Sequence, residues 1–231
     1  MADSRLRDYT ANTLQFKYLT RRLWLAGAAL AGACGHKPPP TPAGPQATAP
    51  LPTAGISGQQ VIVLPFTLIA AEDSLRWEGA LGNRRVVLGR ADSIVVTLLQ
   101  ARAPEVSWLG PDELRRAAHH APGIAPDPDQ MGTAILRARA LEVVPDPLRS
   151  QLRTLAALAG NGGSRYAFVP AALVYKRTGT SLPPTGLAEL TIVLADTRTG
   201  RIGWRTVATG EGTDPWSALT RAVKSLTPGL P

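Results

Sequence analysis

Few side chains in this sequence have the types and spacing that chemistry requires. His119-His120, followed by Asp127 and Asp129, is the cluster that has the residue types of a metal site. Adjacent helical positions point about 100° apart, so two neighbouring histidines seldom reach one ion, and we expect an exposed helix end there. Glu72-Asp73 is a pair of acids, but no histidine, lysine or arginine is arranged to tune it for general acid and base catalysis.

Motifs of known enzyme classes are missing from the sequence as well. It contains no Gly-x-Ser-x-Gly nucleophile elbow, no Walker loop and no His-Glu-x-x-His pair. Four tryptophans indicate core positions rather than a sugar-binding platform: Trp77, Trp108, Trp204 and Trp216. The residue types therefore predict no enzyme, no metal site and no cofactor.

Cys34 is the only cysteine, so the chain forms no internal disulfide and no multi-cysteine metal site. It closes an apolar run that begins at Leu23, directly after Arg21 and Arg22. In a helix this run spans about 16 Å, roughly half the hydrocarbon core of a bilayer, and is too short for a transmembrane anchor. Basic residues, a short apolar run and small residues before a cleavage point are the parts of a signal peptide.

The residues that precede Cys34 suggest a lipid attachment site. Leu30, Ala31, Gly32 and Ala33 resemble the lipobox of bacterial lipoproteins, although that family usually has leucine where Ala31 stands. The resemblance implies that a signal peptidase cuts before Cys34, whose thiol already carries diacylglycerol, so the mature chain is held by membrane lipid. The alternative is an ordinary signal peptide cut after Ala33, with Cys34 incidental.

Two further features of the N-terminal segment bear on export and location. Gly35, and not aspartate, follows Cys34, which resembles the outer-membrane sorting pattern of Gram-negative lipoproteins. Thr20-Arg21-Arg22 and the apolar residues after it resemble a twin-arginine export signal. Arg21 and Arg22 serve equally well as basic residues of an ordinary signal peptide, so both export routes stay open. We expect a lipid-anchored protein of the cell envelope, on the outer membrane and facing the periplasm.

Prolines cluster between Pro38 and Pro52 and separate a tail from a body. Such a composition favours extended polyproline II, at about 3.1 Å per residue. The sequence therefore predicts a signal peptide at 1–33, a lipidated cysteine and proline-rich tether at 34–58, and a single domain at 59–231.

The formal charge of +8 does not indicate a nucleic-acid partner. Residues 1–33 carry +3 of it, which leaves with the signal peptide. The remaining basic residues sit singly among acids, as Arg115 and Arg116 do beside Asp112 and Glu113. They form no dense stripe and do not alternate with aromatic residues, so a solvated, arginine-rich surface is expected.

The domain begins with patterns of a parallel αβ unit. An apolar, β-branched run at 61–66 predicts a buried strand, and the spacing of Ala91, Ile94, Val95 and Leu98 predicts an amphipathic helix. A second strand is expected at 106–109, followed by a helix that opens with proline and two acids at 111–113. Two more helices are expected within 127–160, the second starting at Asp146-Pro147.

The rest of the domain changes to a period of two. Strands are predicted at 166–175, 189–195 and 202–209, the last two joined as a hairpin. Asp214-Pro215 then opens a final helix. The predicted fold class is α/β (α+β): a mixed sheet with a C-terminal antiparallel meander, covered by helices.

Three stretches carry a family resemblance. The first strand ends in Pro65-Phe66, the hairpin at 194–204 reads Leu-Ala-Asp-Thr-Arg-Thr-Gly-Arg-Ile-Gly-Trp, and an amphipathic helix ends the chain. Together they resemble the αβ domain shared by the TolB N-terminal domain, the CsgG-type secretion lipoproteins and the lipoprotein activators of penicillin-binding proteins. The resemblance covers about 59–227, and its motifs are structural, so it implies a fold more than a function.

These features favour a non-catalytic envelope lipoprotein that binds or scaffolds another envelope component. The expected partner is an outer-membrane or peptidoglycan-associated protein, besides the membrane lipid at Cys34. The alternative is an envelope hydrolase or carbohydrate-acting enzyme with an unrecognised site. That alternative requires a pocket holding paired carboxylates or a histidine beside a carboxylate.

Overall fold

The computed structural model describes residues 48–228, except 161 and 181. The N-terminal predictions lie outside the described residues: Arg21, Arg22, the lipobox residues Leu30 to Ala33, Cys34 and the tether as far as residue 47.

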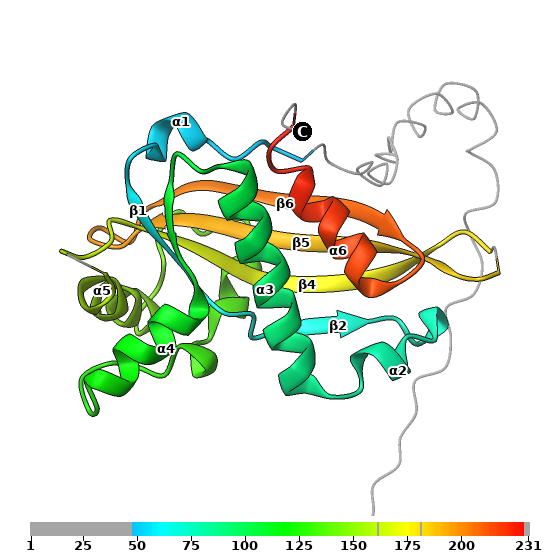
Figure 1. Cartoon of the computed structure of the whole chain (residues 1–231), viewed down its shortest axis with the longest axis horizontal. Helices are drawn as coiled ribbons and strands as arrows, with labels where there is room; N and C mark the ends of the chain where they lie inside the picture. The colour runs from blue at the N-terminus through cyan, green and yellow to red at the C-terminus, as the bar shows by residue number, and fades with distance from the viewer. Residues whose placement is uncertain (1–47, 161, 181, 229–231) are drawn as a thin grey trace, which may run out of the picture. The chain divides into compact units, whose positions relative to one another are not determined.

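The domain is built on a six-stranded mixed sheet of order β3-β1-β4-β5-β6, in which β2 also pairs with β4 (Figure 1). β1 lies parallel to β3 and β4, and β2 lies parallel to β4, whereas β4, β5 and β6 form an antiparallel meander. The predicted fold class is confirmed. The strands are β1 Gln60–Val63, β2 Ile69–Ala71, β3 Ser107–Leu109, β4 Tyr166–Thr178, β5 Thr185–Asp196 and β6 Ile202–Gly212.

Helices cover both faces of this sheet (Figure 1). On one face, α3 and α6 pack over a core that includes Val63, Phe168 and Leu190. On the other face, α4, α5 and the turn η3 cover Ile62 and Val169. The helices and 3₁₀ turns are α1 Thr53–Ile56, η1 Asp73–Leu75, α2 Glu78–Leu81, α3 Arg84–Arg102, α4 Pro111–His120, η2 Pro128–Gln130, η3 Thr133–Arg137, α5 Leu148–Leu158 and α6 Pro215–Lys224.

Local sequence explains where the predicted helices begin. The side chain of Asp214 accepts hydrogen bonds from the backbone N–H groups of Trp216 and Ser217, and Pro215 occupies the first turn of α6. α4 starts at Pro111 and has acids in its first turn, where the helix dipole favours negative charge. None of the described helices combines the length and apolar character needed to cross a membrane.

One predicted helix is wrong. The first of the two expected within 127–160 is replaced by the short turns η2 and η3, with Met131 in extended backbone between them. The side chain of Asp127 accepts a bond from the N–H of Asp129, which stabilises a turn rather than a continuing helix. The second expected helix is confirmed as α5.

The folded body also includes residues before Gln59, where the sequence predicts its start. Leu51 and Ile56 are buried in the core. The N–H of Leu51 donates a 2.8 Å hydrogen bond to the carbonyl of Leu226, just after α6. The described part of the proline-containing segment therefore packs on the domain.

Candidate binding groove at the free edge of β2

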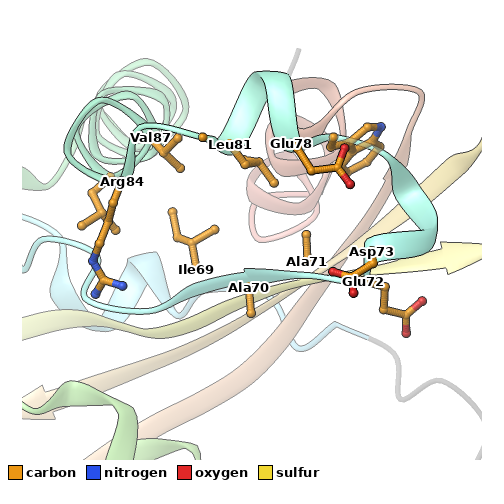
Figure 2. Close-up of a pocket in the computed structure, with 12 residues that line it drawn as sticks. Ile69, Ala70, Ala71, Glu72, Asp73, Glu78, Leu81, Arg84 and Val87 are labelled. Carbon is orange, nitrogen blue, oxygen red and sulfur yellow. The ribbon is translucent and has the colours of Figure 1, made fainter.

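A cleft of about 400 Å³ opens between β2 and the helices α2 and α3 (Figure 2). Such a volume is typical of ligand-binding sites in proteins. Residues from β2, from η1 and α2, and from the first turn of α3 line it: Ile69, Ala70, Ala71, Glu72, Asp73, Trp77, Glu78, Leu81, Gly82, Arg84, Val87 and Leu88. We name this cleft the β2 groove.

One side of the groove is a strand edge with free hydrogen-bonding groups. β2 pairs in parallel with β4, where the carbonyl of Leu68 and the N–H of Glu72 bond to it. Because alternate residues of a parallel strand bond to the same neighbour, the N–H and C=O groups of Ile69 and Ala71 point away from β4. No other described strand pairs with β2. These groups are available to a strand from another molecule.

The interior of the groove is apolar. Ile69 and Ala71 point from β2 toward Leu81 and Val87 across the cleft (Figure 2). Trp77 closes one end, and its ring packs edge-on against Tyr175, with centroids 5.4 Å apart.

Trp77 reaches this position because Gly186 lies against it. A Cβ atom at Gly186 would come within 2.3 Å of the tryptophan ring. A glycine in β5 thus shapes the end of the groove, far along the chain from the residues that line it.

Charges of opposite sign flank this apolar interior. Glu72, Asp73 and Glu78 are exposed at one end. Glu72 accepts a 2.9 Å hydrogen bond from the backbone N–H of Arg177, and within residues 48–228 neither Asp73 nor Glu78 has an ion-pair partner. At the other end, Arg84 donates a 2.7 Å hydrogen bond to the carbonyl of Thr67. The groove is therefore suited to an extended chain that places a cation near the three acids.

The residues considered as a metal cluster are separated by the fold. His119 and His120 are exposed in the last turn of α4. Asp127 caps η2, and Asp129 pairs with Arg115 rather than with a histidine. Among the described residues, no group of three or more potential ligands is close enough to hold an ion.

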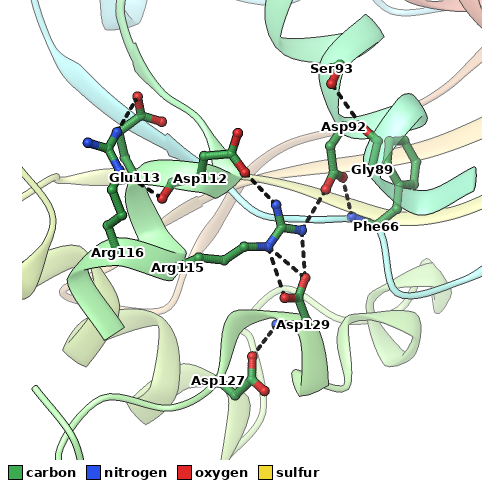
Figure 3. A network of polar contacts seen from close by, with 10 residues as sticks. All are labelled: Phe66, Gly89, Asp92, Ser93, Asp112, Glu113, Arg115, Arg116, Asp127 and Asp129. Carbon is green, nitrogen blue, oxygen red and sulfur yellow. Dashed lines mark hydrogen bonds and ion pairs between the residues drawn. The ribbon is translucent and has the colours of Figure 1, made fainter. Parts of the chain in front are cut away.

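Asp129 belongs instead to a polar network centred on Arg115 (Figure 3). The Arg115 guanidinium contacts carboxylate oxygens of Asp92 at 2.9 Å, Asp112 at 2.9 Å and Asp129 at 2.7 Å. The other oxygen of Asp92 accepts a 2.8 Å bond from the N–H of Phe66. The network joins α3, α4, η2 and the segment after β1.

Burial dominates the electrostatics of Asp92, whose side chain is 6% exposed. It raises the pKa of this carboxyl from 3.8 to about 6, although the bonds from Phe66 and Arg115 act in the opposite direction. The carboxylates of Asp129 and Asp92 raise the pKa of Arg115 further above its ordinary value. Its ion pairs and hydrogen bonds hold α3, α4 and η2 against the segment that follows β1.

The tryptophans occupy the core positions that the sequence predicts. Trp77 and Trp108 are buried, and the N–H of the Trp108 ring donates to the carbonyl of Ala103 at 2.9 Å. Trp204 and Trp216 are half-buried against the same core.

Sequence reasoning missed the apolar groove residues and the pair Asp92–Arg115. A three-residue strand leaves no periodicity to detect. The acid Asp92 does leave a signal, because it follows Ala91 directly on a helix face that is otherwise apolar.

No family model matches this chain, and no curated protein matches it. Solved structures with similar arrangements include the PelC dodecamer from Paraburkholderia phytofirmans, at 14% identity over 79% of this chain and 96% of that one, with a TM-score of 0.36. The LpoB C-terminal domain from Salmonella enterica is 17% identical over 66% of this chain and 82% of that one, with a TM-score of 0.33. The hypothetical protein CT253 from Chlamydia trachomatis is 12% identical over 74% and 94%, with a TM-score of 0.42.

At these scores the three likenesses carry no argument about function. The resemblance to TolB and CsgG-type domains, drawn from residues 61–66 and 194–204, stays a prediction.

Proposed function

We propose that this chain is a non-catalytic lipoprotein of a bacterial cell envelope that binds an extended segment of another envelope protein. The observation that carries the proposal is the β2 groove, where a free strand edge lies beside an apolar cleft. Extended peptides commonly bind by adding a strand to such an edge, with alternate side chains entering pockets. The backbone groups of Ile69 and Ala71 would pair with the incoming strand, and Leu81 and Val87 would contact its side chains.

Charge specifies the partner segment further. Asp73 and Glu78 have no ion-pair partner among the described residues and lie at one end of the groove, so the segment carries lysine or arginine there. Its side chains that enter the cleft are apolar, because Ile69, Ala71 and Leu81 line the interior. An outer-membrane or peptidoglycan-associated protein with an extended, basic-ended segment fits this description.

Attachment of the chain through Cys34 is the first prediction. We expect to find the lipidated chain, which begins at Cys34, in the membrane fraction. Its mass should include several acyl chains, which together make the attachment effectively permanent. Cys34→Ala is expected to abolish both the acyl mass and the membrane recovery. The intact mass of both proteins, measured from membrane and soluble fractions, checks this. An unlipidated chain that starts near Cys34 in the soluble fraction would contradict it.

Strand addition at β2 gives the second prediction. Ala71→Pro removes an N–H that points away from β4, so it blocks the edge while the bonds between β2 and β4 stay in place. We expect it to abolish partner crosslinking from a photoreactive residue placed at Leu81 in the full lipidated chain. Ala71→Ser, which keeps the N–H, is the matched control and should retain the crosslinked product.

A second crosslinking position tests the location of the partner. Val86 is 63% exposed and does not line the groove, so a photoreactive residue there should give no product with the same partner. A product that survives Ala71→Pro, or one that forms equally from Val86, rules out binding along the β2 edge. Equal thermal unfolding midpoints of the proline and serine variants would show that the fold is intact.

A hydrolase is the second candidate, because three carboxylates line the groove. The pair used by glycosidases places one carboxyl in a buried, apolar environment. Glu72, Asp73 and Glu78 are all exposed instead, and no histidine is among the described residues that line the cleft. Glu72→Gln with Glu78→Gln would abolish hydrolysis under this alternative, whereas under the binding proposal it weakens the partner's affinity.

A further inference from the structure

A second pocket, of about 620 Å³, lies where the segment after η3 meets β5 and β6. Arg205 and Val207 of β6 and Thr191 of β5 line one side. Residues 137–139 line the other. The pocket shares no residue with the β2 groove. We name it the arginine pocket.

The charged side chains that line the arginine pocket are all positive. Three of its lining residues are arginines, and none of the described lining residues is an acid: Arg137, Ala138, Arg139, Thr191, Arg205, Thr206 and Val207. Arg137 and Arg139 are exposed, and no hydrogen bond or ion pair joins either side chain to another described residue. Arg115 and Arg165, in contrast, are paired with carboxylates.

Arg205, which lines the pocket, is held in place by two hydrogen bonds. Its guanidinium donates hydrogen bonds to the carbonyl oxygens of Ala138 at 2.6 Å and Leu141 at 3.0 Å. Its Nε is buried and has no hydrogen-bond partner among the described atoms. Partial burial without a carboxylate lowers the pKa of Arg205 below its ordinary value. An anion in the pocket would compensate this desolvated charge.

We propose that the arginine pocket binds a phosphate ester. Guanidinium groups present planar, paired N–H donors that match phosphate oxygens, and they keep their charge in the absence of a ligand. The hydroxyl of Thr191 supplies a further donor on the β5 side. The volume of about 620 Å³ exceeds that of a single phosphate group and leaves room for a glycerol or sugar moiety attached to it.

Two sources offer this chemistry, a phospholipid headgroup and a soluble phosphate ester. Both place a tetrahedral anion among the three arginines. The site is independent of the proposed β2 groove, so either proposal can fail without the other.

The test uses the mature chain from residue 34 with Cys34→Ala, so that neither an acyl chain nor the signal peptide attaches it to vesicles. Glycerol 3-phosphate and inorganic phosphate are titrated by calorimetry. Phosphatidylglycerol vesicles and phosphatidylcholine vesicles are compared by co-sedimentation. The variant Arg137→Gln with Arg139→Gln removes two cations whose side chains make no hydrogen bond or ion pair with another described residue. Arg85→Gln with Arg198→Gln is the matched control, because it removes equal charge from exposed side chains outside the pocket.

We expect the protein to bind the soluble esters or the phosphatidylglycerol vesicles. The pocket variant should weaken this binding at least about tenfold, and the control variant should leave it unchanged. Binding to the vesicles alone identifies a headgroup as the source, and binding to glycerol 3-phosphate identifies a soluble ester. Equal weakening in both variants would show diffuse charge attraction and overturn the proposal. Absence of binding to every probe would overturn it as well.

Discussion

Replacing Arg115 by leucine is expected to lower the free energy of unfolding by about 3–5 kcal/mol at pH 7.5. Arg115 contacts the carboxylates of Asp92, Asp112 and Asp129, and Asp92 is 6% exposed. Without the guanidinium, a buried carboxylate is left with a single hydrogen bond, from the N–H of Phe66. Breaking one side of a buried ion pair costs much more than the pair contributes, because the remaining charge has lost both water and partner. Urea unfolding of both proteins measures the difference.

The size of this loss should depend on pH. Burial raises the folded-state pKa of Asp92 from 3.8 to about 6, so the folded protein binds more protons than the unfolded chain between these values. Stability from protonated Asp92 is present below about pH 4 and is lost as the pH rises through 6, by about 3 kcal/mol. Removing Arg115 raises the pKa of Asp92 further, because its hydrogen bond and its charge both lower that pKa.

At pH 5 the carboxyl is therefore largely protonated in both proteins, and the difference between them should shrink by at least half. Asp112→Asn is the control, since Asp112 is 87% exposed and should change stability by less than about 1 kcal/mol. An equal loss at pH 5 and pH 7.5 would show that Asp92 does not titrate as its burial requires.

The long elements of the fold were predictable because their patterns repeat along the sequence. The strands β4, β5 and β6 are thirteen, twelve and eleven residues long, and burial alternates along the first half of β5. α6 has both a capping aspartate and an apolar face. In each of these elements local preference and tertiary packing agree. The α/β fold class followed from their order.

The candidate site was not predictable, because the short elements that form it have no repeating pattern in the sequence. β2 is three residues long and α2 four, and neither contains enough residues for a periodic signal. β2 exists because Ile69 to Ala71 pair with Leu173 to Tyr175, about a hundred positions later. The groove is a property of that pairing and of Gly186 beneath Trp77, so local sequence contains no trace of it.

The turns at 127–137 show how tertiary contacts outweigh helical pattern. The hydroxyl groups of Thr133 and Thr67 lie 2.8 Å apart in a hydrogen bond. Met131 and Leu136 are buried in the second core cluster. Burying these residues on the face opposite α3 requires the chain to turn at Gly132, which a continuous helix would prevent.

The packing of α6 on β6 gives the other large expected effect. Gly210→Ala should lower the free energy of unfolding by about 3 kcal/mol, because its Cβ has no space. A Cβ at this position would lie 2.2 Å from the N of Ala222 and 2.5 Å from the carbonyl oxygen of Ala218, both in the backbone of α6. Backbone atoms of a packed helix cannot turn aside as a flexible side chain can, so α6 itself must move away from the sheet.

Gly203→Ala on the same strand is the control. It separates a clash with α6 from the general preference of strands for residues other than glycine. Its nearest contact for a new Cβ is at 3.9 Å, so alanine there should change stability by less than about 1 kcal/mol. Denaturant unfolding of both variants decides between the causes. A large loss confined to Gly210 means that close approach of α6 to the sheet sets the need for glycine. Similar small changes at both positions mean that α6 shifts without cost, and that its packing on β6 contributes less to the fold than the geometry implies.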